Sequence, residues 1–283
     1  MKTKLISLLR QTWNFIPEKI RIPIRSIFEL IVKYFIGSYS TVVIARSSFQ
    51  VPHSNNSEFW NIHLAAQHEP ETLSQFITCL DSLPQPITIY DIGANYGFYS
   101  LVAASYSQTQ HKHIMIFAFE PDSQNYERLV RGISLNSFDN IKPLQLAVAN
   151  KTTGTQRILP LFGSGENATL GYTDIENQDL NYQSCKVLAI DDLVEQKEIL
   201  PPTLVKMDIE GYELEALYGM TTVLTQYKPQ LLLEIHSEYL QRLGASPDEL
   251  FTYMSKFGYK WIHLHPKGKG ASYGHKQEHV FFF

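Results

Sequence analysis

The segment Ile89-Tyr-Asp-Ile-Gly-Ala-Asn-Tyr-Gly-Phe98 decides the fold, because it joins an apolar strand to an acidic residue, a glycine-containing turn and the start of a helix. Gly93 and Gly97 allow the backbone of this turn to bend sharply and to approach a ligand closely. A dinucleotide-binding Gly-x-Gly-x-x-Gly loop would need glycine at the position of Asn95. This difference counts against a nucleotide-dependent oxidoreductase, which we keep only as an alternative.

Short apolar strands alternate with helical segments from Pro86 onward. The apolar residues predict strands over 87–90, 113–119, 141–148, 203–207, 230–235, 260–264 and 279–283. Helical spacing covers 98–106, 123–136 and 212–227, and Ser246 caps a further helix that stops at Gly258. Alternating strands and helices imply right-handed crossovers. We therefore expect an α/β fold, with a mostly parallel sheet covered by helices on both faces.

The alternation of predicted strands and helices, which begins near Pro86, divides the chain into three parts. Residues 1–60 are expected to form a basic, partly helical extension, residues 86–264 the α/β core, and residues 265–283 a C-terminal loop and last strand. Residues 150–185 interrupt the core and are rich in Gly, Thr, Asn and Asp. We expect them to form inserted loops with a hairpin.

The first 60 residues contain eight basic and three acidic residues, although the net charge of the whole chain is −4. Between positions 20 and 36, apolar and basic residues alternate with helical spacing. One interpretation is a basic helix that rests on a membrane surface or on a partner. The other, which we prefer, is a helix that covers an edge of the core and leaves its lysines in water.

The composition predicts a soluble, cytoplasmic protein. A hydrophobic share of 44% and a charged share of 18% are typical of a globular domain, and the acidic net charge offers no footprint for nucleic acid. Cys79 and Cys185 make neither a disulfide framework nor a metal-binding spacing, which favours reduced thiols. No run approaches the roughly 18 apolar residues of a membrane-spanning helix.

An acidic residue, Glu120, ends the strand that follows the glycine turn. In an open α/β sheet, ligands bind outside the carboxyl ends of the strands. A carboxylate there can accept hydrogen bonds from both vicinal hydroxyls of a ribose. The glycine turn and Glu120 together therefore fit an adenosyl ligand.

Two later strand ends also carry ionisable side chains. Asp208 and Glu210 follow the strand over 203–207. Glu234 and His236 share one face of the next strand, because their spacing is two. The carboxyl ends of parallel strands meet at one rim, so we expect these side chains to lie on the same rim as Gly93.

The chain resembles the FkbM family of S-adenosylmethionine-dependent methyltransferases over residues 87 to about 260. The matching motifs are Asp91-Ile-Gly-Ala-Asn-Tyr-Gly97, Phe119-Glu-Pro-Asp122, Ile190-Asp-Asp-Leu193, Lys206-Met-Asp-Ile-Glu-Gly-Tyr-Glu213, Leu217-Tyr-Gly219 and Pro229-Gln-Leu-Leu-Leu-Glu-Ile-His236. The resemblance implies a Rossmann-like class I methyltransferase fold, and the N-terminal helical extension and the insert over 150–185 lie outside it. It also implies S-adenosylmethionine as the cofactor.

The resemblance also implies which residues hold that cofactor. They are Asp91, Gly93, Asn95, Gly97, Glu120, Ala147, Val148 and Asp208. Glu120 would bind the ribose, Ala147 and Val148 would lie near the adenine, and the others would surround the methionine end.

Methylation of an alcohol at neutral pH benefits from a general base. The candidates for the catalytic residues are Asp208, Glu210, Glu234 and His236, which the sequence does not rank. A divalent cation held by Asp208, Glu210 or Glu234 could instead lower the pKa of the hydroxyl. We expect an O-methyltransferase that acts on a sugar, a glycan precursor or a secondary metabolite. The alternative is a scaffold that binds the cofactor without catalysing.

The acceptor is not encoded in an obvious motif. Aromatic residues in the insert, Phe162, Tyr172 and Tyr182, could stack on an acceptor ring or could anchor their own loop. The loop over 265–275 is the other segment that we expect to contribute to the choice of acceptor.

Overall fold

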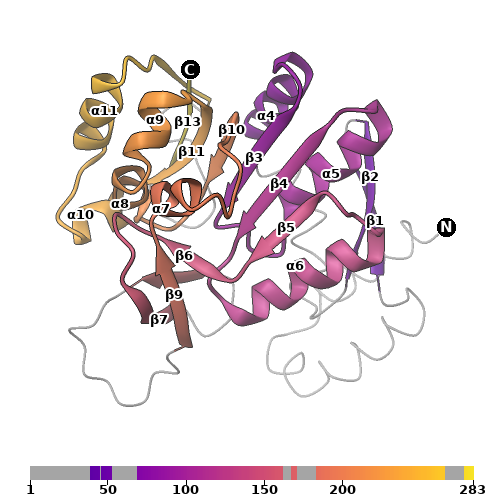
Figure 1. Ribbon diagram of the computed structural model, residues 1–283, viewed down its shortest axis with the longest axis horizontal. Helices are drawn as coiled ribbons and strands as arrows, with labels where there is room; N and C mark the ends of the chain where they lie inside the picture. Colours follow the sequence, from indigo (N-terminus) through magenta and orange to yellow (C-terminus); the bar gives the residue numbers. More distant parts are fainter. Residues whose placement is uncertain (1–38, 45, 53–68, 162–166, 171–182, 265–276) are drawn as a thin grey trace, which may run out of the picture.

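The computed structural model describes residues 39–44, 46–52, 69–161, 167–170, 183–264 and 277–283. Its centre is a seven-stranded sheet with the order β12-β13-β11-β10-β3-β4-β5 (Figure 1). The parallel strands are β3 (Ile87–Ile92), β4 (Ile114–Phe119), β5 (Ile141–Leu144), β10 (Leu204–Met207) and β11 (Gln230–His236). The α/β fold with a mostly parallel sheet is confirmed.

The C-terminal strand is an internal part of this sheet. β13 (Gln277–Phe282) lies between β11 and β12 (Trp261–His263) and is antiparallel to both. The strand expected after the core is therefore part of the core sheet, and its last four side chains, from His279 to Phe282, are buried.

Helices cover both faces because the strands are apolar on both sides. All six residues of β3 are buried. Ile87 and Ile89 pack with α4 (Pro70–Ser82), α5 (Phe98–Gln110) and α6 (Ser123–Asn136). Tyr90 and Ile92 pack on the other face with α7 (Ile190–Glu195), α8 (Glu213–Tyr218), α9 (Thr221–Gln226) and α11 (Pro247–Lys256). α10 (Ser237–Arg242) directly follows β11.

The single strand predicted over 141–148 is wrong, because the chain divides it between two sheets. β5 ends at Leu144, and β6 (Leu146–Val148) begins a four-stranded sheet of order β6-β9-β7-β8. The other strands of this smaller sheet are β7 (Gly154–Leu161), β8 (Asn167–Leu170) and β9 (Gln183–Leu188). Figure 1 shows β6, β7 and β9 below the central sheet. The expected hairpin is present as β7–β8, and the insert is more regular than its composition suggests.

The single helix predicted over 212–227 is also wrong, because it is two short helices, α8 and α9. The break falls at Gly219, where a Cβ would lie 2.0 Å from the carbonyl oxygen of Ala149. The carboxylate of Asp191 accepts hydrogen bonds from the backbone N–H groups of Thr222 (2.7 Å) and Val223 (3.0 Å). A close backbone contact and a side chain from α7 thus end one helix and start the next.

Part of the N-terminal extension packs on the core. β1 (Tyr39–Ile44) and β2 (Ser47–Pro52) form an antiparallel hairpin beside α5 and α6 (Figure 1). Phe49 and Val51 are buried there. The helix predicted over 20–36 lies outside the described residues, so its two interpretations stay predictions. Among the helices that the structure describes, none has the length and hydropathy needed to cross a membrane.

Asn136 joins the hairpin to the core, and its removal is expected to destabilise the fold. Its Oδ1 accepts from the backbone N–H of Gln50 at 2.6 Å, and its Nδ2 donates to the carbonyl of Gln50 at 2.7 Å. We expect Asn136→Ala to lower the free energy of unfolding by about 1–3 kcal/mol, because the partly buried backbone groups lose their partner. Urea denaturation measures this change. Arg131→Ala, which removes an exposed ion pair on the same helix, should change stability by less than about 0.5 kcal/mol.

Candidate active site

The glycine turn lies at the point where the strand order reverses, because β3 is flanked by β4 on one side and β10 on the other. Gly93 has φ +80°, and a Cβ there would lie 1.9 Å from the carbonyl oxygen of Asp208. Gly97 has φ +88°, and its Cβ would lie 2.4 Å from Cδ1 of Leu129. The turn therefore needs glycine both for its conformation and for its packing, and it brings Gly93 against Asp208.

Glu120 is buried beneath this turn and holds its shape. Its Oε2 accepts from the backbone N–H of Asn95 at 2.7 Å, and its Oε1 accepts from the backbone N–H of Asp122 at 2.9 Å. Burial raises the pKa of Glu120 to about 8, although both hydrogen bonds oppose the shift. Donors from a ligand that reached this carboxyl group would favour its ionised form.

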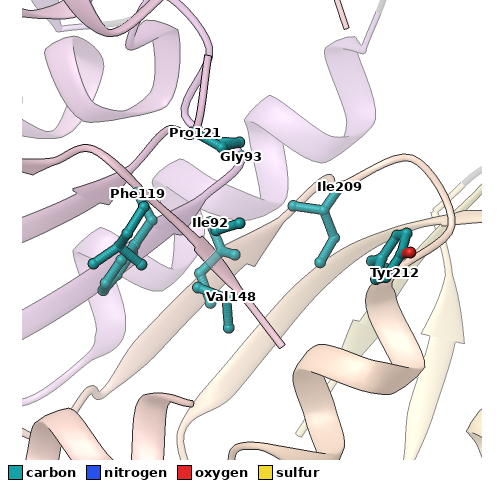
Figure 2. A pocket seen from close by; sticks show the side chains of 9 residues that line it. Ile92, Gly93, Phe119, Pro121, Val148, Ile209 and Tyr212 are labelled. Carbon is teal, nitrogen blue, oxygen red and sulfur yellow. The ribbon is translucent and has the colours of Figure 1, made fainter. Parts of the chain in front are cut away.

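An apolar hollow of about 340 Å³ lies beside the ends of β3, β4 and β6. Figure 2 shows side chains around it from these strands and from the segment that follows β10. The residues that line it are Ile92, Gly93, Phe119, Pro121, Leu146, Ala147, Val148, Ile209 and Tyr212. The structure thus places Ala147 and Val148 where a flat, apolar ring could bind next to the glycine turn.

Asp91 supports the turn from inside the protein. Its Oδ2 accepts from both the backbone N–H (3.0 Å) and the hydroxyl (2.5 Å) of Ser100 in α5. Burial raises the pKa of Asp91, and its hydrogen bonds to Ser100 and the charge of Lys206 oppose the shift. Asp91 also lines a second hollow, of about 620 Å³, together with Asn95, Lys206 and Asp208. This second hollow, which shares Gly93 with the apolar one, can take a polar group.

A buried lysine stands beneath two of the candidate acids. The Nζ of Lys206 lies 3.9 Å from Oδ2 of Asp208, 4.0 Å from Oε2 of Glu234 and 5.1 Å from the ring centre of Tyr99. Burial alone would lower the pKa of Lys206, but the charges of Asp208 and its acidic neighbours raise it. The raised pKa favours the charged form of Lys206, whose ammonium faces both acidic side chains.

His236 lies at the centre of four carboxylates. Its Nδ1 is 2.9 Å from Oε1 of Glu213, and its Nε2 faces oxygens of Glu210 (3.3 Å), Asp208 (3.7 Å) and Glu234 (3.7 Å). Burial alone would lower the pKa of His236, but the hydrogen bond to Glu213 and the surrounding charges raise it well above its usual value. The four residues proposed as catalytic from the sequence are thus brought together.

The acids of this cluster differ in charge and in access. Burial and the charges of Asp208 and Glu69 raise the pKa of Glu234 well above its usual value. Burial also acts to raise the pKa of Asp208, but Lys206 and His236 outweigh it and lower that pKa. The side chain of Asp208 is 35% exposed, against 7% for Glu234. Asp208 is therefore the ionised group that an incoming molecule meets first.

Sequence reasoning missed four participants in the site: Lys206, Glu213, Glu69 and His279. The signal for Lys206 was a lysine inside an otherwise apolar strand, which requires charged partners when buried. Glu69 and His279 come from opposite ends of the described chain and lie 3.9 Å apart next to Glu234. No pattern within either segment predicts that Glu69, at the start of α4, lies close to His279 in β13. Phe162, Tyr172, Tyr182 and the loop over 265–275, expected near the acceptor, lie outside the described residues.

The raised pKa of Glu120 predicts a pH-dependent affinity for S-adenosylhomocysteine. Ribose hydroxyls would donate to the ionised carboxylate, whereas the free protein holds a proton there below about pH 8. The affinity is therefore expected to fall as the pH falls, by up to about tenfold per unit below 8. Calorimetry between pH 6 and 8.5 measures it. Glu120→Gln should bind weakly and without this slope, and an affinity of the wild type that stays constant over the range would contradict the assignment.

The strand order, the glycine turn at the switch point and the buried acid at the next strand end define a Rossmann-like class I methyltransferase fold. Residues 91–261 match the family model described as "Methyltransferase FkbM domain", and the chain belongs to this family. The expected family is thus confirmed, and the oxidoreductase alternative is not favoured.

Known proteins with related sequences or structures include methyltransferases. The chain is 25% identical over 177 residues to the hexuronic acid methyltransferase AglP of Haloferax volcanii, a match that covers 62% of this chain and 65% of that protein. It is 24% identical to methyltransferase FkbM from Methylobacillus flagellatus KT, with a TM-score of 0.45 and coverage of 70% of this chain and 43% of that one. The chain thus spans less than two-thirds of the length of either protein.

Proposed function

We propose that this protein is an S-adenosylmethionine-dependent O-methyltransferase that methylates a hydroxyl group of a sugar or glycan acceptor. The observation that carries the proposal is the contact between Gly93 and Asp208. Because the glycine turn packs on the carbonyl of Asp208, the cofactor cradle and the acidic cluster share one residue. A ligand held by the turn would present its reactive end to the cluster.

The residues of the cradle fit the adenosyl cofactor. Glu120 keeps lone pairs for the ribose hydroxyls beside the apolar hollow, which suits the adenine. Asp91, Asn95 and Lys206 line the polar hollow, which suits the charged methionine end. When bound, the cofactor supplies a methyl group on a sulfonium that is already electrophilic.

The chain must then align an acceptor hydroxyl and favour loss of its proton. Asp208 is suited to this role because it is ionised, partly exposed and next to Gly93. Lys206 and His236 hold its two oxygens from opposite sides. We propose that Asp208 receives the hydrogen bond of the hydroxyl, and that Glu210, Glu234 and His236 maintain the charge and the orientation of Asp208.

The sugar acceptor is supported by the relative whose name gives its substrate as a hexuronic acid. A sugar would offer several hydroxyls near a cluster of hydrogen-bonding carboxylates. No feature of the described residues favours the alternative of a scaffold that binds without catalysing.

A methyl-transfer assay with Asp208→Asn tests the proposal. The protein is incubated with methyl-labelled S-adenosylmethionine and a panel of sugars and glycans, hexuronic acids among them, and the methylated product is located by mass spectrometry. We expect Asp208→Asn to lower turnover by about 100-fold or more, because the amide keeps the size but not the charge. Asp248→Asn, on α11 and away from the site, should transfer at the wild-type rate. Equal turnover of Asp208→Asn and wild type would refute the role of Asp208.

A further inference from the structure

The acidic cluster of Asp208, Glu210, Glu213 and Glu234 has one side that faces Lys206 and another that faces His236. Asp208 directs Oδ2 toward Lys206 and Oδ1 toward His236, and Glu234 does the same with Oε2 and Oε1. Each carboxylate is therefore shared between the lysine and the histidine. The space between Oδ1, Oε1 and the imidazole does not contain the lysine ammonium.

The imidazole of His236 is aimed into that space. Glu213 fixes the ring through Nδ1, in the manner of a carboxylate that orients a metal-bound histidine. The opposite nitrogen, Nε2, is buried and makes no hydrogen bond to any residue in the described ranges. The carboxylate oxygens that face it lie 3.3–3.7 Å away, so a partner that bridges the nitrogen and these oxygens would complete its contacts.

The spacing of the ligand atoms suits an ion better than hydrogen bonds. Nε2 lies 3.7 Å from Oδ1 of Asp208 and 3.7 Å from Oε1 of Glu234, whereas a hydrogen bond prefers about 2.7–3.2 Å. Two ligands that each bind one ion at about 2.1 Å can be at most about 4.2 Å apart. Both distances fall inside that limit. An oxygen of Glu210, 3.3 Å from Nε2, is near enough to join them.

We propose that Asp208, Glu234 and His236 bind a divalent cation, with Glu210 beside them and Glu213 orienting the imidazole. Carboxylate oxygens suit Mn²⁺, and an imidazole beside them favours a transition-metal ion of this kind over Mg²⁺. The cation would offset the excess of carboxylates around Lys206.

The role of the ion rests on the proposed methyl transfer, but its binding does not. A cation held by Asp208 would lie next to the Gly93 contact, where an acceptor hydroxyl would arrive. A hydroxyl that coordinates it would have a lowered pKa and would be oriented for attack. His236 is then a ligand and Glu213 a positioning residue.

Electron paramagnetic resonance of Mn²⁺ tests the site directly, because the signal of the free ion disappears on binding. The full chain, stripped with chelator and without S-adenosylmethionine, is titrated with MnCl₂. We expect about one bound Mn²⁺ per chain. We expect His236→Gln and Glu213→Gln to weaken binding by about 10- to 100-fold. His263→Ala, which removes another histidine paired with a glutamate on the same sheet, should bind as the wild type does.

Three results would overturn the proposal. The first is wild-type protein, folded by circular dichroism, that leaves the Mn²⁺ signal unchanged up to about 1 mM. The second is an unchanged affinity in folded His236→Gln and Glu213→Gln. The third is a loss of binding in His279→Ala with none in His236→Gln, which would assign the ion to Glu69, Glu234 and His279 instead. Binding of S-adenosylhomocysteine by the same metal-free protein reports separately on the proposed function.

Discussion

Replacing His236 with alanine is expected to lower turnover by about 100- to 10,000-fold, the largest effect of any single change at the acidic cluster. The substitution removes the group that Asp208, Glu210, Glu213 and Glu234 surround. It removes one of the cations beside Asp208, so the pKa of Asp208 should rise and its Oδ1 loses the imidazole that faces it. Steady-state assays give kcat and KM, and a thermal melt separates lost chemistry from lost folding. His263→Ala should keep wild-type turnover.

The pH dependence of turnover distinguishes what His236 does. Burial acts to lower the pKa of His236, but Glu213 and the other carboxylates raise it well above the usual value, so loss of the proton needs a higher pH than in an ordinary histidine. If His236 is the general base, turnover should keep rising with pH well past neutrality. If it acts as a fixed positive charge, turnover should not rise as its proton is lost. If it is a metal ligand, the rise should weaken as the metal concentration increases, because the metal competes with the proton for Nε2. Equal turnover of His236→Ala and the wild type across the pH range would exclude all these roles.

Gly93→Ala is expected to abolish measurable binding of S-adenosylhomocysteine and to destabilise the fold by several kcal/mol. The residue has φ +80°, and its new Cβ would lie 1.9 Å from the carbonyl oxygen of Asp208. The two nearest atoms belong to the backbone of Asp208 and cannot rotate away as a side chain could, so the turn and the segment that follows β10 must separate. Calorimetry with S-adenosylhomocysteine and urea denaturation measure the two effects.

Gly244→Ala is the matched control for this substitution. Gly244 has φ +79°, yet no atom lies within 4 Å of its Cβ position. Gly244→Ala should therefore lose only the folding free energy that a positive φ costs a residue with a Cβ, about 1 kcal/mol, and should bind the ligand as the wild type does. The contact between the turn and Asp208 would not be needed for ligand binding if both variants lost the same stability and Gly93→Ala still bound S-adenosylhomocysteine.

The sequence was sufficient for the elements whose pattern is local. β3, β4, β10 and β11 are short apolar runs, and α6 covers 123–136 as predicted. The Ser246 cap is present, because its hydroxyl accepts from the backbone N–H of Glu249. These elements place their acidic ends on one rim, so the cluster of Asp208, Glu210, Glu234 and His236 could be anticipated.

Tertiary contacts explain what the sequence could not show. The break between α8 and α9 depends on Asp191 and on the backbone at Ala149, both distant in the chain. The separation of β5 from β6 depends on pairing with β9. In the site, Glu69 and His279 approach Glu234 only because β13 inserts next to β11. The raised pKa of His236 likewise needs neighbours that one strand does not contain.

Calorimetric binding of S-adenosylhomocysteine to the folded chain is the most direct test of the claim that the glycine turn and Glu120 form an adenosyl site. We predict one ligand per chain for the wild type. We predict a loss of about 10-fold or more in affinity for Glu120→Ala, because two ribose hydroxyls lose a charged acceptor. A folded wild-type protein that does not bind, or a Glu120→Ala variant with wild-type affinity, would contradict the account.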